Sequence, residues 1–273
     1  MGHQPAMGRE GVNGVEELLA RIAPWSRTFV LRTGPGVVDA AEREAAADPA
    51  DAVYRGDVLA DPGSGAATEA IALHARARGM DPDLAAASLA FQRYAHRVAG
   101  VAVAAWAAEG LILDLTAPRV WTVVRSGSPH HLVAERVRAL PDGDLGTLVH
   151  TVVDEHLEPV ARAWNAVSGL SMEDLHGNMA ASFAAACRQL SKVLPADEMR
   201  ALGEDILARR AELVDGGTFR ILTGADGRRL FFDRSTCCSW HASPHGEYCS
   251  GCPHTSYEQR TGRFEAMLAT DWH

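Results

Sequence analysis

The stretch DLAAASLAFQRYAHRVAGVAVAAWAA, residues 83–108, is the longest helix that the sequence predicts in this chain of 273 residues. Alanine and leucine favour helices, and their spacing here has helical periodicity. Its most apolar part, Val98 to Ala108, ends at Glu109 and is shorter than the eighteen or more uncharged apolar residues of a membrane span. The stretch therefore predicts a buried helix at the centre of a helical fold.

Further helical signals lie on both sides of this stretch. Helix formers recur at helical spacing over Ala66–Arg78, Asp83–Ala108, His130–Ala139, Leu145–Ser168, Ser171–Val193 and Ala196–Val214. Prolines at positions 82, 129, 141 and 195 separate them. Pro159 lies inside Leu145–Ser168 and predicts a kink or a split there. Together these signals predict a helical, bundle-like domain over residues 63–215 with about six helices.

The first 62 residues have mixed character. Val15 to Ala23 is amphipathic, and Thr28 to Leu31 reads as a short strand stopped by Gly34-Pro35-Gly36. Asp61 to Gly65 has the composition of a linker. We therefore expect a separate N-terminal segment, residues 1–62.

The periodicity changes after residue 215. Thr218–Thr223 and Arg228–Asp233 carry aromatic and branched residues on both sides of a Gly224–Gly227 turn, which is typical of a β-hairpin. The second strand leads directly into the cysteines. We expect residues 216–273 to form this hairpin and a metal-binding segment, so the fold class is mainly α (α+β) with a short N-terminal β element.

Charge and leader composition exclude several classes of protein. The formal net charge of −9 argues against a nucleic-acid surface, which normally needs a basic patch. Met1 to Glu16 is polar and glycine-rich, unlike a secretory leader. We expect a cytoplasmic protein with reduced thiols and no membrane span.

Four of the five cysteines form one cluster, Cys237, Cys238, Cys249 and Cys252. Thiolates select soft metals and iron–sulfur clusters. A structural zinc site needs two half-sites of C-x-x-C type, and the adjacent pair Cys237-Cys238 is not one, because consecutive side chains diverge on an extended backbone. An iron–sulfur cluster is favoured by this spacing, while zinc and a disulfide framework stay open.

The pattern C-C-x10-C-x2-C, preceded by Arg234 and followed by Pro253, resembles the FhuF-type ferric-siderophore reductases. Leu175-His176-Gly177-Asn178 is similar to the Leu-Trp-Gly-Asn of that family, with His176 in place of tryptophan. Ser239 and His241 also depart from the family, which has an aliphatic residue and a tyrosine there. The resemblance extends over roughly residues 65–255.

The resemblance implies one [2Fe-2S] cluster on Cys237, Cys238, Cys249 and Cys252, and one-electron reduction of hydroxamate-type ferric siderophores, with no catalytic residues beyond these ligands. No G-x-G-x-x-G follows a strand, so we expect electrons from an external ferredoxin or flavoprotein reductase. Peripheral docking at a membrane transporter stays open. The alternatives are an iron–sulfur redox or iron-sensing protein without turnover, and a zinc-stabilised interaction module.

Several residues near the cysteines are candidates for contacts with the chelate or the donor. They are Arg234, Trp240 and Tyr248. His241, His245 and His254 are weaker candidates for histidine ligation. Arg220, Arg228 and Arg229 are candidates for a patch that docks an acidic ferredoxin, with solvated hairpin charges as the ordinary interpretation. Cys187 is expected in the core. The net negative charge predicts that a catecholate chelate, whose ferric complex is more anionic, reacts more slowly.

Overall fold

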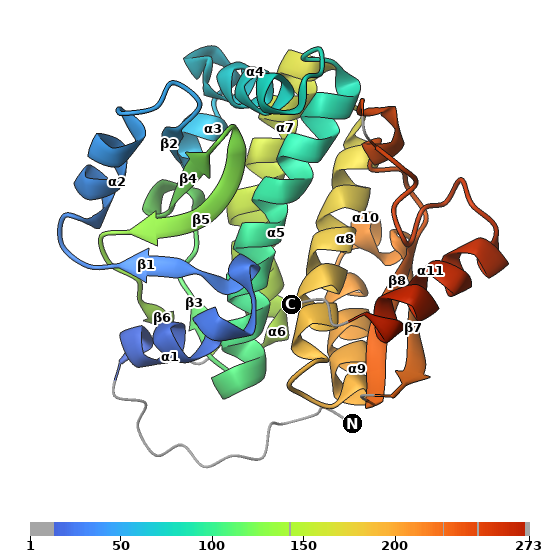
Figure 1. Ribbon diagram of the computed structural model, residues 1–273. Coiled ribbons are helices and arrows are strands. Elements are labelled where there is room, and N and C mark those ends of the chain that lie inside the picture. The colour runs from blue at the N-terminus through green and yellow to red at the C-terminus, as the bar shows by residue number, and fades with distance from the viewer. Residues whose placement is uncertain (1–13, 142, 226, 245, 271–273) are drawn as a thin grey trace.

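The long helix α5 (Leu84–Glu109) runs through the middle of the molecule (Figure 1). The computed structural model describes residues 14–141, 143–225, 227–244 and 246–270. Asp83 caps α5 by accepting hydrogen bonds from the N–H groups of Ala85 and Ala86, at 2.9 and 3.0 Å. Gly110 ends the helix in the left-handed conformation, with φ 66°.

The helices that the sequence predicts are present, with one exception. Before α5 lie α1 (Val15–Ile22), α2 (Val37–Ala45), α3 (Gly56–Leu59) and α4 (Ala66–Arg78). After it lie α6 (Leu145–Val149), α7 (Glu158–Ser168), α8 (Met172–Leu190), α9 (Ala196–Leu207), α10 (Ala211–Val214) and α11 (Tyr257–Ala269). A π-helical segment, His150–Leu157, joins α6 to α7, so the helix changes type just before Pro159.

The predicted helix His130–Ala139 is wrong. This region forms β5 (Ser128–Ala134), which pairs antiparallel with β4 (Trp121–Arg125). Ser126 and Gly127, with φ 48° and 68°, make the two-residue turn between these strands. The sequence has part of a hairpin pattern here, because a Ser-Gly turn follows Trp121–Arg125, a run rich in β-branched residues.

A four-stranded sheet in the order β1-β5-β4-β2 covers one side of α5 (Figure 1). The edge strand β2 (Ala52–Arg55) is antiparallel to β4, and β1 (Leu31–Thr33) is parallel to β5. The strand predicted at Thr28–Leu31 therefore begins about three residues later, because Arg27–Phe29 forms a 3-10 turn.

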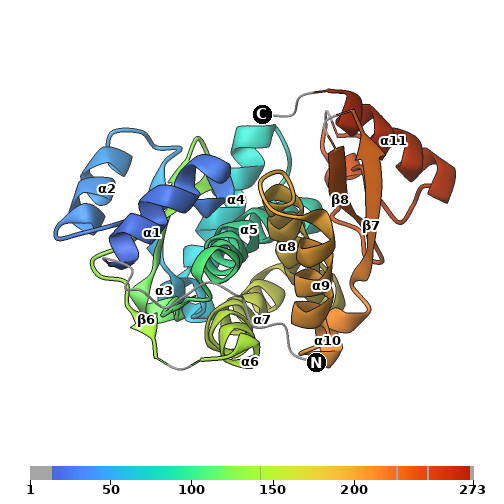
Figure 2. The same cartoon turned by 90° about the horizontal axis from the view of Figure 1, so that it is seen from below.

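The C-terminal hairpin lies on the far side of α8 and α9 from α5, as Figure 2 shows. Its strands are β7 (Gly217–Gly224) and β8 (Gly227–Arg234), paired antiparallel as predicted. A second small sheet pairs β3 (Ile112–Leu113) with β6 (Ala139–Leu140). Mainly α with small sheets is thus the fold class that the sequence predicted.

One large hydrophobic core joins these layers. Buried residues of α5 and α8, together with Leu230 and Phe232 of β8, belong to it. Leu59 and Ala66, on either side of the predicted linker, belong to it as well. The segment boundaries at residues 62 and 215 stay a prediction. Among the described helices, none is long and apolar enough to cross a membrane.

Candidate functional site

The four clustered cysteines follow β8 in a single loop that ends at α11. Cys238 and Cys252 are buried, whereas Cys237 and Cys249 are half-buried, and all four are free thiols. The N–H of Arg234, the last residue of β8, donates to the carbonyl of Gly251 at 3.0 Å. This bond fixes the C-x-x-C turn against the end of the strand, so both halves of the cysteine pattern meet there.

The thiols interact with one another. Those of Cys238 and Cys249 are hydrogen-bonded, which lowers the pKa of Cys238 to about 5 and, together with burial, raises that of Cys249. Burial raises the pKa of Cys237, and the neighbouring charges of Cys238 and Cys252 act in the same direction. The N–H of Ser239 donates to Cys237 Sγ at 3.3 Å. The loop thus gathers four sulfurs, the donor type that binds zinc and iron–sulfur clusters.

The arrangement of the thiols bears on whether they would hold one metal ion or a two-iron cluster. Within the described part of the chain, no three His, Cys, Asp or Glu side chains converge as ligands of one metal ion. A [2Fe-2S] cluster with four cysteine ligands takes two thiolates on each of two irons, so it asks for two pairs of sulfurs. The donor type of these thiols fits that requirement, and Cys238 and Cys249 form one hydrogen-bonded pair, while Cys237 interacts with Cys238 and Cys252 through charge.

The helix α8 holds the cysteine loop through a buried polar chain. Asn178 Oδ1 accepts a hydrogen bond from Arg234 at 2.7 Å, and its Nδ2 donates to Ser88 Oγ at 3.0 Å. Ser88 in turn donates to the carbonyl of Cys238 at 3.2 Å. Asn178 and Ser88 are both fully buried. Two side chains of α5 and α8 therefore fix the strand end and the adjacent cysteine backbone.

Gly177 permits the close approach of the loop to α8. A Cβ at this position would lie 2.7 Å from Thr236 Cβ and would overlap its hydroxyl. Thr236 immediately precedes the cysteine pair. The Leu175–Asn178 stretch thus has a local role: Gly177 gives space for the loop, and Asn178 holds Arg234 at the strand end that leads into it.

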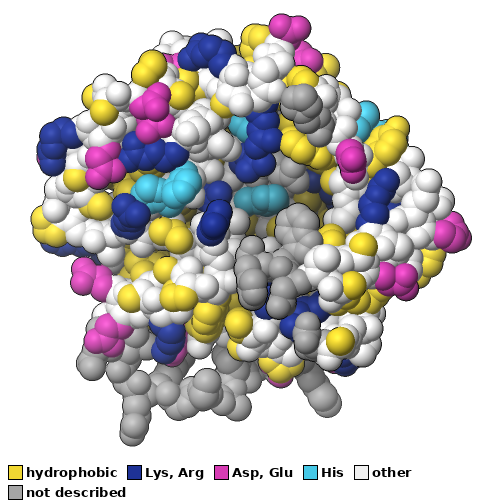
Figure 3. Space-filling model, viewed as in Figure 1, with side chains coloured by type: hydrophobic (Ala, Val, Ile, Leu, Met, Phe, Trp, Pro, Cys, Tyr) yellow, Lys and Arg dark blue, Asp and Glu magenta, His cyan; other side chains and the backbone are white. Residues whose placement is uncertain are grey.

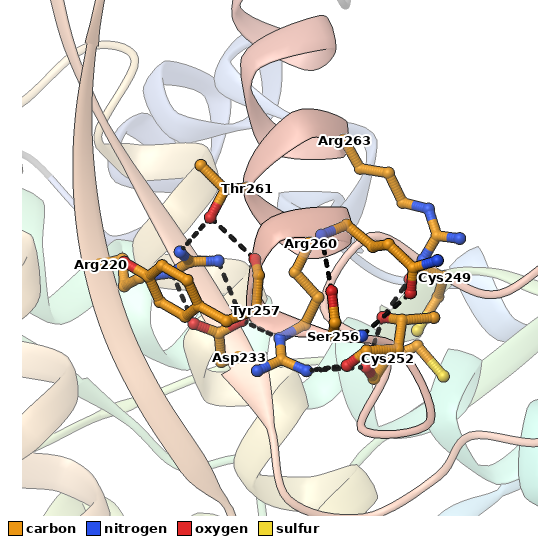
Figure 4. A network of polar contacts seen from close by, with 11 residues as sticks. Arg220, Asp233, Cys249, Cys252, Ser256, Tyr257, Arg260, Thr261 and Arg263 are labelled. Carbon is orange, nitrogen blue, oxygen red and sulfur yellow. Dashed lines mark hydrogen bonds and ion pairs between the residues drawn. The ribbon is translucent and has the colours of Figure 1, made fainter.

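The helix α11 holds the loop from the opposite side, as Figure 4 shows. Arg263 donates to the carbonyl of Cys249 at 3.3 Å, and Arg260 donates to that of Cys252 at 3.4 Å and to that of Thr255. Arg260 also pairs with Asp233 of β8, with 2.6 Å between Nε and Oδ1. The backbone of the C-x-x-C turn is thereby tied to both the hairpin and α11.

The three candidate contact residues lie in different environments. Arg234 is buried, so it is not a solvated cation at the strand end. Trp240 lies on a 3-10 turn with the Arg78 guanidinium 5.1 Å from its ring centroid. Tyr248 is 45% exposed and stacks on His241, with ring centroids 5.1 Å apart.

The histidines near the cysteines and the remaining cysteine also differ in their surroundings. His241 Nδ1 lies 3.7 Å from Cys237 Sγ, while His245 lies outside the described residues. His254 packs edge-on against His241. Cys187 is fully buried in the core, as predicted, and burial raises its pKa to about 12.

Two arginines proposed for a docking patch are paired instead. Arg220 donates to Asp233 Oδ1 at 3.1 Å, and Arg228 pairs with Asp197 of α9. The Arg220 guanidinium also stacks over Tyr257, 4.4 Å from the ring centroid. These side chains hold the hairpin to its neighbours, which the sequence pattern of an exposed strand does not reveal.

A cavity of about 310 Å³ opens beside the thiols. Cys238, Cys249, Arg234 and Trp240 line it, whereas Tyr248 does not. Further polar lining comes from helices α5 and α8, which contribute Gln92, Arg93, His96 and Arg188, and from Ser250 of the cysteine loop. Sequence reasoning missed these residues, although arginine and histidine at i and i+3 in an alanine-rich helix are a visible signal.

Comparisons with known proteins give a distant likeness to a solved structure. No family model matches the chain, and no curated protein matches it. Among solved structures, the chain is similar to aerobactin synthetase IucC from a hypervirulent pathotype of Klebsiella pneumoniae, with a TM-score of 0.43 and 13% sequence identity. The likeness covers 57% of this chain and 32% of the synthetase, so it spans about a third of that protein's length.

Proposed function

We propose that this protein is a cytoplasmic ferric-chelate reductase that holds a [2Fe-2S] cluster on Cys237, Cys238, Cys249 and Cys252 and reduces hydroxamate-type ferric siderophores. The observation that carries the proposal is the gathering of these thiols in one loop beside a cavity. The resemblance of the cysteine pattern to FhuF-type reductases supports the choice of cluster and substrate.

The residues around the thiols suit an anionic redox group. Cluster potentials depend on charge, on hydrogen bonds to sulfur and on solvent exposure. Here the Ser239 N–H donates to Cys237 Sγ, and the buried cation Arg234 acts on the charges of Cys238 and Cys249. Both interactions stabilise negative charge on the thiolates. They would therefore favour the reduced state of a bound cluster and raise its reduction potential.

The proposed reaction moves one electron and cuts no bond of the chelator. When bound, the cluster supplies single electrons. An external ferredoxin or flavoprotein reductase gives up one electron, and chelated Fe(III) gains it and becomes Fe(II). Hydroxamate oxygens are hard ligands that hold Fe(II) far less tightly than Fe(III), so reduction releases the metal. Arg234 and Trp240 line the cavity where the chelate would approach.

The composition of the metal site is the first test. Protein purified anaerobically should be red-brown, with about two irons and two sulfides per chain. Absorption and EPR spectra before and after dithionite should show one-electron reduction. One zinc per chain without inorganic sulfide would overturn the cluster and favour a zinc-stabilised module.

Turnover is the second test. Dithionite-reduced, desalted protein, mixed anaerobically with a ferric trihydroxamate and a strong Fe(II) trap, should reoxidise at a rate that rises with chelate concentration. NADPH alone should not reduce the oxidised protein. A matched sample with the gallium(III) chelate controls for reoxidation without iron reduction. Equal reoxidation rates with the iron and gallium chelates would overturn the reductase function and favour a sensing or redox role without turnover.

A further inference from the structure

The cavity beside the thiols is positively charged in a protein whose formal net charge is −9. Arg93, Arg188 and Arg234 line it together with His96, and no Asp or Glu occurs among the described lining residues. Figure 3 shows dark-blue and cyan side chains gathering across the middle of this face, while most magenta side chains lie toward its edge. The local field therefore differs in sign from the charge of the whole chain.

Two of these arginines have no acidic partner. Arg93 and Arg188 form no ion pair with any Asp or Glu of the described residues, whereas Arg220 and Arg260, elsewhere in the fold, are both paired. Burial lowers the pKa of Arg188 and, with the charge of Arg78, lowers that of Arg93 to about 10. Half-buried cations without counter-charges are costly, and an anion in the cavity would offset that cost.

His96 supplies a further polar group. Its Nε2 is enclosed and has no hydrogen-bond partner among the described residues. Buried polar atoms are normally paired, and an unpaired one at the wall of a cavity indicates a missing partner. Guanidinium groups bind carboxylates through paired, charge-assisted hydrogen bonds, so the lining has the donors that a carboxylate needs.

We propose that this cavity binds a carboxylate carried by the ferric chelate, so that the protein prefers hydroxamate siderophores with a free carboxylate over neutral ones. The inference rests on the proposed function and names the substrate class within it. At about 310 Å³ the cavity is at the small end of ligand pockets, which suits one carboxylate-bearing arm. The chelated metal would then lie on the side of Cys238 and Cys249, which line the same cavity.

The rival explanation is that the arginines serve only as counter-charges to the thiolate site. Arg234 contacts that site most directly, since its charge acts on both Cys238 and Cys249. A counter-charge alone would shift the reduction potential and would not discriminate between chelates. Binding of a redox-inert metal complex separates the two explanations.

The test compares two gallium(III) complexes on the cluster-containing protein. One is a linear trihydroxamate with a terminal succinyl carboxylate, and the other is its methyl ester. Equilibrium dialysis at low ionic strength should give a carboxylate complex bound about tenfold more tightly than the ester, because each charge-assisted bond contributes at that scale. Arg188→Gln and Arg93→Gln should each remove most of this preference and leave the affinity for the ester unchanged.

Control variants and outcomes keep the test decisive. Arg200→Gln removes an exposed arginine of α9, whose Nε lies 3.9 Å from Glu204, and should keep the preference. Helical circular dichroism identifies any variant that has not folded, and either arginine variant alone suffices for the test.

Equal affinities for the acid and the ester in the parent protein would overturn the proposal. So would an arginine variant that shifts only the reduction potential. Gallium binding needs no electron transfer, so the two proposals can fail separately. If the protein bound the carboxylate complex but never reduced iron, the proposed reductase function would be wrong and the proposed carboxylate site would stand.

Discussion

At the scale of single residues, Asn178 links the helical core to the cysteine loop. Its amide accepts from Arg234 and donates to Ser88, and all three side chains are buried or nearly so. Asn178→Ala should lower the free energy of unfolding by about 1–3 kcal/mol, because a buried guanidinium and a buried hydroxyl each lose one hydrogen bond. Urea titration measures this change, and the visible absorption per chain measures retention of the metal group.

A matched asparagine distinguishes the local role from a general one. Asn165 of α7 donates to the carbonyl of Leu170 at 2.8 Å, far along the chain from the cysteines. Asn165→Ala should lower stability without changing the absorption per folded chain. If Asn178→Ala left both quantities at their original values, the polar chain to the loop would have no energetic role.

Gly177 is the second residue whose role is local. Gly177→Ala places a methyl group against Thr236, and the loop must move to admit it. We expect overpacking to lower the free energy of unfolding by about 1–3 kcal/mol. We also expect the displaced loop to bind the proposed metal group less tightly. Gly262→Ala in α11 is the control, because a Cβ added at this position meets nothing within 4 Å. This substitution should stabilise the helix by up to about 1 kcal/mol. Calorimetry that gave both variants the same sign would contradict this account.

At this scale the sequence predicted the cysteines and missed the residues that surround them. Thiols are rare and their spacing is informative, so Cys237 to Cys252 can be identified without a fold. Arg93 and His96 lie at i and i+3, but that signal is weak beside the cysteine spacing, because arginines on helices are common, and Arg188 carries no pattern at all. They become a site only when α5 and α8 bring them to one cavity.

At the scale of elements, the cysteine loop lies outside the large hydrophobic cluster. The large hydrophobic cluster includes β8 through Leu230 and Phe232, but Cys187 is the only cysteine among its described members. Cys249→Ser should therefore remove the visible absorption and keep the far-ultraviolet helical signal. Cys187→Ser gives the contrasting case, since it places a hydroxyl in the core and should destabilise the fold. Loss of helicity in Cys249→Ser would mean that the metal group supports the whole fold.

Sequence periodicity predicted the long elements and failed where pairing is non-local. Helices α4, α5, α8 and α9 follow their apolar spacing, and the β7–β8 hairpin has a local turn. The strand β5 was predicted as helix, and its partner β1 lies about a hundred residues earlier. The pairing with β1 leaves no local pattern, because the tertiary environment decides it, whereas the Ser126-Gly127 turn to β4 is a local signal that the helix prediction overlooked.

At the scale of the molecule, the net charge and the charge of the cavity have opposite signs. The value of −9 predicts slower reaction of a catecholate chelate, which stays a prediction, while the cavity is lined by three arginines and by no described acidic residue. On the face that Figure 3 shows, most acidic side chains lie toward the edge. Salt screens charges beyond about 10 Å, so an approaching ligand experiences mainly the cavity.

Buried histidines give the whole molecule a defined response to acid. Burial lowers the pKa of His74, His131 and His156 to about 4 each, against about 6.5 in an unfolded chain. Between these values the unfolded chain binds protons that the folded chain does not, so acid favours unfolding. The free energy of unfolding should be greatest above pH 6.5 and should fall as the pH drops toward 4, by up to about 1.4 kcal/mol per pH unit for each histidine.

Urea titrations at pH 7.5, 6.5, 5.5 and 4.5 measure this dependence. The Cys249→Ser protein is the right background, because acid loss of a metal group cannot then contribute. His74→Gln should reduce the slope by about 1.4 kcal/mol per pH unit, since one proton-binding difference disappears. Its ring is fully buried and bonds only to the carbonyl of Gly127 among the described residues, at 3.2 Å. A flat profile between pH 6.5 and 4.5, or one that rises toward acid, would show that these histidines are protonated in the folded protein.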